Sequence, residues 1–68
     1  MLIRLNELLD LFEDNDNIEI HGRNLLMNDT KEKILENIDY FLFSRHFVKR
    51  IGLSTDWRIR PIFKIYID

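Results

Sequence analysis

The spacing of apolar residues alternates between two periods along this chain, and this alternation constrains the fold most. Residues 6–14 and 30–42 carry apolar side chains at the three- and four-residue intervals of an amphipathic helix. Residues 18–27 and 47–67 alternate apolar and polar side chains, as half-buried strands do. The order helix-hairpin-helix-hairpin predicts an α+β fold, with a four-stranded antiparallel sheet and two helices on one face.

A chain of 68 residues is expected to form a single domain over residues 1–68. Because so short a chain buries only roughly 60% of its unfolded surface, it needs accurate patterning or self-association for stability. There is no cysteine, which excludes disulfides and is typical of a cytoplasmic protein. The N-terminal residues do not follow the pattern of a secretory signal, and no segment is apolar enough to span a membrane.

The first half contains a helix signal followed by a hairpin signal. Asn6 is the expected N-cap of a helix over residues 6–14, which the polar run 14–17 ends. The pair Gly22-Arg23 favours a two-residue turn that places Ile20 opposite Leu25. This register predicts one buried face of the hairpin, formed by Ile18, Ile20, Leu25 and Met27.

The second predicted helix begins at a capping box, in which Asp29 is the cap and Glu32 reaches back to it. Its apolar stripe consists of Ile34, Leu35, Ile38, Phe41 and Leu42. Tyr40 and Phe43 lie off this stripe. Either the helix stops near Leu42 and Phe43 turns inward, or the two aromatic side chains project away from the core.

Residues 47–67 predict a second hairpin around the loop 54–57. Lys49 does not fit its apolar face, and Pro61 indicates an edge strand or a bulge. The expected inner face comprises Phe47, Ile51, Leu53, Ile59, Phe63, Ile65 and Ile67. The expected core of the domain comprises Ile20, Leu25, Ile34, Ile38, Phe41, Phe63 and Ile65.

Catalytic and metal-binding motifs are missing from the sequence. It has no glycine-rich phosphate loop and no cysteine nucleophile, and neither Ser44 nor Ser54 lies in a nucleophile elbow. The two histidines, His21 and His46, do not have the spacing of a zinc site, and the acidic turn 13–17 departs from a calcium loop. We therefore expect no enzyme activity, no cofactor and no metal.

The charge of the chain is strongly polarised. Residues 1–40 carry four Lys/Arg and ten Asp/Glu, a net charge of −6, whereas residues 41–68 carry six and two, a net charge of +4. The outer face of the second hairpin collects the candidates for binding single-stranded nucleic acid: Arg50, Arg58, Arg60 and Lys64. The pI of about 5.6 and the acidic half oppose this function, so the expected affinity is weaker than micromolar at ~150 mM salt.

Aromatic side chains without an evident place in the core favour protein contact instead. The candidates are Tyr40, Phe43, Trp57, Ile62 and Tyr66. The expected arrangement is a homodimer through the second hairpin, in which the last strands pair edge to edge. Contact with another protein remains an alternative.

Four features of the chain stand in a characteristic order: a helix pattern over residues 5–12, a turn rich in Asp and Asn, the strand Ile18-Glu19-Ile20 and a final basic, isoleucine-rich hairpin. Together they resemble small proteins encoded in prophages of low-GC Gram-positive bacteria. The resemblance covers residues 1–22 and 47–68. It implies a phage accessory protein of unknown specific role. Some phage proteins of this size look like inhibitors of host defence that mimic nucleic-acid charge, and here the acidic half would have that role.

Overall fold

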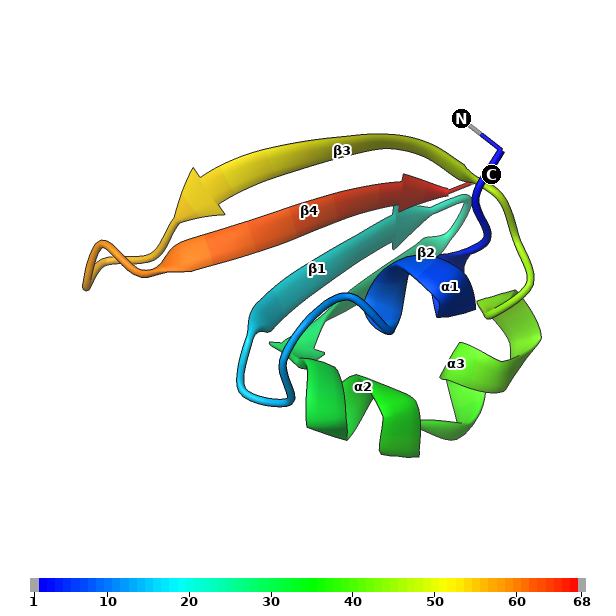
Figure 1. The fold of residues 1–68 in the computed structure, drawn as a ribbon, viewed down its shortest axis with the longest axis horizontal. Coiled ribbons are helices and arrows are strands. Elements are labelled where there is room, and N and C mark those ends of the chain that lie inside the picture. Colours follow the sequence, from blue (N-terminus) through cyan, green and yellow to red (C-terminus); the bar gives the residue numbers. More distant parts are fainter. Residues whose placement is uncertain (1, 68) are drawn as a thin grey trace.

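The computed structural model describes residues 2–67 and shows an α+β fold, in which three short helices gather on one side of a four-stranded sheet (Figure 1). The strand order is β2-β1-β4-β3. In chain order, the elements are α1 (Leu5–Leu9), β1 (Asn17–Gly22), β2 (Leu25–Thr30), α2 (Lys31–Glu36), α3 (Ile38–Phe43), β3 (Val48–Thr55) and β4 (Pro61–Ile67). The prediction of an α+β fold with four strands is confirmed.

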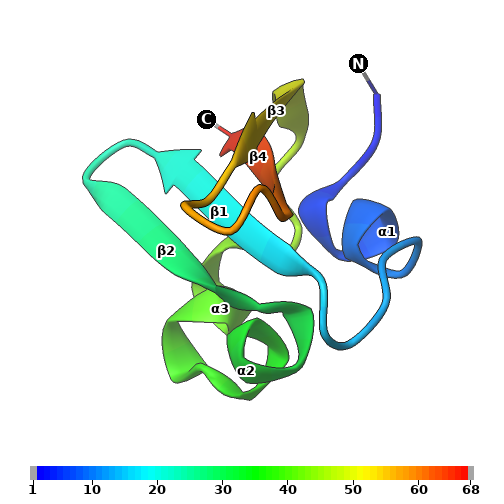
Figure 2. The ribbon, with the colours of Figure 1, turned by 90° about the vertical axis from the view of Figure 1, so that its left-hand side faces the viewer.

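The sheet is mixed, so the prediction of an antiparallel sheet was wrong. The two hairpins are antiparallel, but they join through parallel pairing of β1 with β4, in which Ile20 lies beside Ile65. This order places at the centre the two strands that each contribute two buried residues, and helices cover their inner face (Figure 2). Because β4 lies between β1 and β3, the expected edge-to-edge pairing of last strands in a dimer is also wrong. Pro61 is the first residue of β4, a position that proline tolerates.

The first hairpin has the predicted faces but a different register. Ile20 pairs with Met27, and Gly22 pairs with Leu25, so the turn residues are Arg23 and Asn24. Asn24 adopts a φ of 59°, a left-handed conformation that asparagine tolerates well. Because the register moves each partner by two residues, every side chain stays on its predicted face.

The first helix is shorter than predicted and begins one residue earlier. Its N-cap is Arg4 rather than Asn6, because Arg4 is still extended and forms a β-bridge with Phe47. The chain leaves the helix after Leu9 and brings the Phe12 ring to 4.8 Å from the Phe63 ring, centroid to centroid. Phe12 thereby packs on Phe63 of β4 from a position beyond the end of the helix.

The prediction of one helix over residues 30–42 was wrong, because the helix breaks at Asn37. This residue is extended, with φ −76° and ψ 127°, and its side chain accepts a hydrogen bond from the Asp39 backbone N–H. Asn37 therefore ends α2 and caps α3. The cap of α2 is Thr30 rather than Asp29, with the Thr30 side chain accepting from the Lys33 backbone N–H.

The break rotates α3 relative to α2 and reverses which of its side chains are buried. Ile34 on α2 is buried as predicted, but on α3 the buried residue is Tyr40, while Ile38 and Phe41 are exposed. Ile38 and Phe41 are therefore not core residues. The idea that Tyr40 and Phe43 lack a place in the core was wrong, since Tyr40 is buried and Phe43 packs against the buried cluster.

Among residues 2–67, eleven apolar residues are buried and form the core: Leu5, Leu8, Leu9, Ile18, Ile20, Met27, Ile34, Tyr40, Val48, Ile65 and Ile67. Of the predicted core, Ile20, Ile34 and Ile65 are confirmed, while Leu25 and Phe63 are half-buried.

Strand β3 departs from its predicted pattern in two ways. A bulge between Val48 and Arg50 turns Val48 inward and leaves Phe47 exposed, so the irregularity lies at Lys49 rather than at Pro61. Further along, the hairpin extends past the helices (Figure 1), and its inner face, including Leu53, is largely exposed there.

Within residues 2–67, no helix is both long enough and apolar enough to span a membrane.

Candidate functional site

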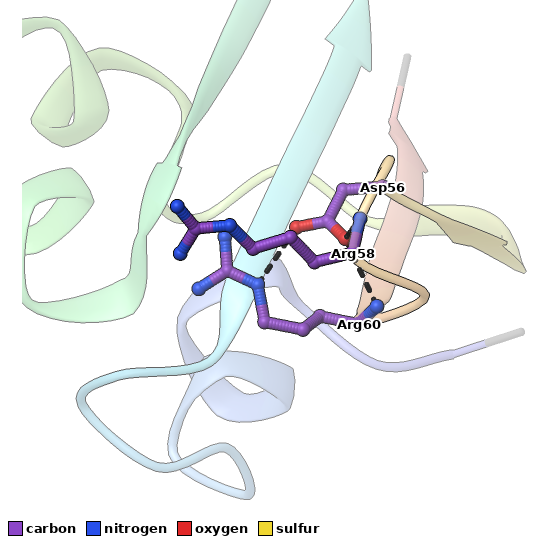
Figure 3. Close-up of polar contacts among 3 residues, drawn as sticks. All are labelled: Asp56, Arg58 and Arg60. Atoms are coloured by element: carbon purple, nitrogen blue, oxygen red, sulfur yellow. Dashed lines mark hydrogen bonds and ion pairs between the residues drawn. The ribbon is translucent and has the colours of Figure 1, made fainter.

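The loop between β3 and β4, residues 56–60, is closed by the side chain of Asp56 (Figure 3). We call this loop the hairpin tip. Asp56 Oδ1 accepts from the backbone N–H groups of Arg58 at 2.8 Å and Arg60 at 2.9 Å. Asp56 Oδ2 accepts from Arg60 Nε at 2.8 Å. Such side-chain acceptance of backbone N–H groups is what makes aspartate a turn residue, and here it closes the loop into a ring.

Backbone hydrogen bonds reinforce the same ring. The Asp56 N–H donates to the Arg60 carbonyl at 3.0 Å, and the Ile59 N–H donates to the Asp56 carbonyl at 2.9 Å. Five hydrogen bonds therefore hold a loop of five residues. These bonds restrain the backbone of the loop.

Hydrogen bonding keeps the Asp56 carboxylate charged. The Arg60 backbone N–H is the largest cause that lowers the pKa of Asp56 below its ordinary value of 3.8, and the Arg60 guanidinium and the Arg58 N–H add to it. Partial desolvation acts in the opposite direction and is outweighed. At neutral pH the loop is therefore closed by an ionised acceptor.

The backbone of the hairpin tip is strained at Ile59, which adopts a φ of 60°. A β-branched residue is rare in this left-handed region, and the conformation costs roughly 1–3 kcal/mol. The Ile59 side chain is 82% exposed, so burial in this chain does not offset the cost. The strained loop therefore exposes the Ile59 side chain on a restrained backbone.

Trp57 is equally exposed, at 82%, and it lies next to a cation. The Arg58 guanidinium carbon is 4.4 Å from the centre of the Trp57 ring, a cation–π arrangement. The hairpin tip thus presents tryptophan, isoleucine and arginine together, and tryptophan and arginine are enriched at the energetic centres of protein interfaces.

The predicted nucleic-acid residues do not form one surface. Arg58 and Arg60 lie at the hairpin tip, whereas Arg50 pairs with Tyr66 near the other end of the hairpin. Lys64 lies between these ends and is half-buried beside Gly52. The predicted basic face is therefore divided along the length of β4.

Tyr66 is not an open platform for a nucleic-acid base. The Arg50 guanidinium lies 4.1 Å from its ring centre, and the His21 ring stacks on it at 4.8 Å with planes 20° apart. Because β3 and β1 flank β4, these two groups cover the ring from opposite sides. Sequence reasoning missed the contact with His21, which depends on the parallel pairing of β1 with β4.

Only one of the five predicted protein-contact residues is fully exposed. Tyr40 is buried, and Phe43, Ile62 and Tyr66 are half-buried, whereas Trp57 projects from the hairpin tip. Sequence reasoning missed Ile59 because its alternation placed it on the inner face of a strand. Asp56 in the loop was the available signal, since aspartate favours turns.

A second exposed surface lies on α3. Ile38 is 79% exposed, and Phe41 and Leu42 are each 71% exposed. We call these three residues the α3 patch. They belong to the stripe that the sequence assigned to the core, and the break at Asn37 turns them outward.

Metal-binding groups do not gather in the part of the chain described. No group of three or more His, Cys, Asp or Glu residues there could hold a metal ion. An open hollow of about 760 Å³ lies beside Tyr66, lined by His21, Gly22, Arg23, Lys49, Arg50, Tyr66 and Ile67. Side chains that line it already contact one another or Glu19, whose Oε1 lies 2.5 Å from His21 Nε2.

No protein-family model matches this chain, and no curated protein or solved structure is significantly similar to it.

Proposed function

We propose that this chain acts through protein–protein contact or self-association and that the hairpin tip is its contact element. The observation that carries the proposal is the exposure of Trp57 and Ile59, each 82%, on a closed and strained loop. Covering a large apolar side chain returns about 1.5–3 kcal/mol. A partner that covers both side chains therefore gains free energy of apolar burial that is not realised in the free chain.

The order of the loop supports this function. Binding by a flexible loop loses affinity to the entropy of ordering it, and preorganisation lowers that loss. The Asp56 carboxylate holds the backbone of Arg58 and Arg60 in place. Trp57 and Ile59 are consequently presented on a backbone that binding does not have to order.

Single-stranded nucleic acid is the second candidate ligand. Arg58 beside the exposed Trp57 ring favours it, since stacking and cation contacts are what such binders combine. The net charge of −2 and the covered Tyr66 ring weigh against it.

The resemblance to prophage proteins and the cysteine-free composition support a phage-type accessory role in the cytoplasm. An inhibitory role of the acidic half is a further alternative.

Photo-crosslinking in the native cells tests the proposal. A benzophenone amino acid replaces Trp57, and a matched control carries it at Leu11, another exposed apolar position outside the hairpin. We expect a discrete crosslinked product from position 57, weakened by Asp56→Ala, which opens the loop. Equal crosslinking from position 57 and from position 11 would sink the proposal.

A further inference from the structure

We propose that the partner of the hairpin tip is a second copy of this chain, whose α3 patch receives it, so that two copies form a two-fold dimer with two identical contacts. This inference rests on the proposed function of the hairpin tip. It adds the receiving surface and the symmetry of the assembly.

The α3 patch has the properties of a receiving surface. Ile38, Phe41 and Leu42 are 71–79% exposed, although α3 has only six residues. A concentration of apolar side chains on one short helix marks an interaction site more often than a solvated face. The opposite side of α3 is anchored in the core through Tyr40, so the patch is held on a fixed support.

The two surfaces lie at opposite ends of the molecule. The longest extent is 31 Å, and along it the hairpin tip projects at one end while α3 lies toward the other (Figure 1). A two-fold axis perpendicular to this direction exchanges the ends and can therefore bring each hairpin tip to the α3 patch of the other copy. In a two-fold interface, if one residue contacts a second, the second also contacts the first in the other copy. The dimer is therefore closed and leaves neither surface free.

The charges at the two surfaces are complementary. The hairpin tip carries Arg58 and Arg60, of which Arg60 is paired with Asp56, so that the tip has a net positive charge. Glu36 and Asp39, in contrast, lie beside the residues of the α3 patch. Both of these acidic residues are exposed. Opposite charges at the rim of an interface steer the approach and fix orientation. The polarised charge of the chain thus favours contact between unlike ends of two copies over contact between like ends.

The exposed apolar area falls in the range that stable dimer interfaces bury. Five large side chains take part in each copy: Trp57, Ile59, Ile38, Phe41 and Leu42. At roughly 100–200 Å² for each side chain, they supply about 500–1000 Å² per copy. Stable interfaces bury about 600–1000 Å² per partner.

Sedimentation equilibrium of the full chain and two single variants tests the inference. Trp57→Ser removes the centre of the hairpin tip, and Phe41→Ser removes the centre of the α3 patch. We expect wild type at twice the chain mass of 8.3 kDa and each variant at the monomer mass. Leu11→Ser, which alters an exposed apolar residue outside both surfaces, should remain a dimer. Unchanged thermal unfolding of dilute monomers checks that each variant is folded.

Mixing the two variants gives the most specific result. In the mixed dimer, the intact hairpin tip of the Phe41→Ser copy meets the intact α3 patch of the Trp57→Ser copy. One of two contacts is restored, so the mixture should associate at least about tenfold more tightly than either variant alone, and about tenfold or more weakly than wild type. A dimer through two hairpin tips or through two α3 patches gains nothing on mixing, and that outcome would overturn the inference.

A charge exchange supplies an independent readout. Arg58→Glu should weaken association, and Asp39→Arg in the same chain should restore it, because each contact then pairs opposite charges again. If Asp39→Arg does not restore association, this pairing of surfaces is contradicted.

If the wild-type protein stays at the monomer mass at millimolar concentration, the proposed dimer is overturned. A crosslinked product of another mass from position 57 would then leave the proposed function of the hairpin tip intact.

Discussion

Asp56 and Arg60 face each other across the hairpin tip and are joined by three hydrogen bonds. The backbone N–H and the Nε of Arg60 both donate to the Asp56 carboxylate, and the Asp56 N–H donates to the Arg60 carbonyl. This relationship closes the loop around Ile59 and holds it in its left-handed conformation. The contacts between Asp56 and Arg60 consequently hold the backbone that carries the exposed residues of the hairpin tip.

Closure of the hairpin tip should depend on pH. The folded pKa of Asp56 is lowered, so the closed loop is favoured above the ordinary value of 3.8 and is lost as pH falls through the lower folded pKa. We expect the Asp56 carboxyl carbon resonance to titrate with a midpoint below 3.8. The Arg60 Nε proton should shift with the same midpoint, and Asp56→Asn should abolish that shift. A carboxyl midpoint at or above 3.8 would contradict the hydrogen-bonded ring.

Ile59→Gly should stabilise the dilute monomer, in which Ile59 is exposed. Glycine adopts positive φ without the steric cost that Ile59 bears, although it also increases the freedom of the unfolded chain. The expected net gain is about 1 kcal/mol, which corresponds to an increase of about 4–8 °C in the thermal midpoint. The matched control is Ile38→Gly, which alters a similarly exposed isoleucine without positive φ and should give no increase. A lower midpoint for Ile59→Gly would show that Ile59 is not strained.

Ile34 and Ile38 should differ sharply when each is replaced by alanine. In one continuous helix they would share a face, being four residues apart, and would cost the same. Since the helix breaks at Asn37, Ile34 is buried and Ile38 is exposed. Ile34→Ala should lower the free energy of unfolding by about 2–5 kcal/mol, and Ile38→Ala by less than about 0.5 kcal/mol, as measured by denaturant titration of the monomer. Equal losses of free energy of unfolding would indicate one continuous helix instead of the break at Asn37.

Stability at high pH should depend on Tyr40. Burial, and to a smaller extent the Asp10 carboxylate, raise the pKa of Tyr40 above its ordinary value of 10.0. The stabilisation is therefore complete below pH 10.0 and is lost as pH rises through the higher folded pKa. Urea titrations between about pH 9 and about pH 11 should show a steeper loss for wild type than for Tyr40→Phe. Parallel losses in the two proteins would exclude a buried phenol.

Single-stranded DNA should bind weakly. Both faces of the Tyr66 ring are covered, and the arginines of the hairpin are divided between its two ends. Fluorescence anisotropy with labelled oligothymidine at ~150 mM salt should give a dissociation constant weaker than about 1 μM. Sub-micromolar binding that Arg58→Glu and Arg60→Glu abolish together would instead identify the hairpin tip as a nucleic-acid site.

Local patterns were informative wherever a result depends on neighbours in the chain. The alternation through Ile18 and Ile20 predicted the buried face of the first hairpin, and it survived an error of register because side chains on a strand repeat every two residues. The same logic failed at Val48, where the bulge at Lys49 exchanges the two faces. The exposed tryptophan of the candidate site was predicted from its lack of a place in the apolar faces, whereas the conformation of Ile59 was not predicted.

Turn residues and apolar periods act over a few residues, so they were enough to predict the α+β class, the two hairpins and a loop at Trp57, although the loop spans residues 56–60 rather than 54–57. The parallel pairing of β1 with β4 and the helix break at Asn37 did not follow from these local signals. Both depend on competition between distant surfaces for burial. Tyr40 occupies the core and thereby turns the apolar residues of α3 outward, a choice that the periodicity of one helix does not encode.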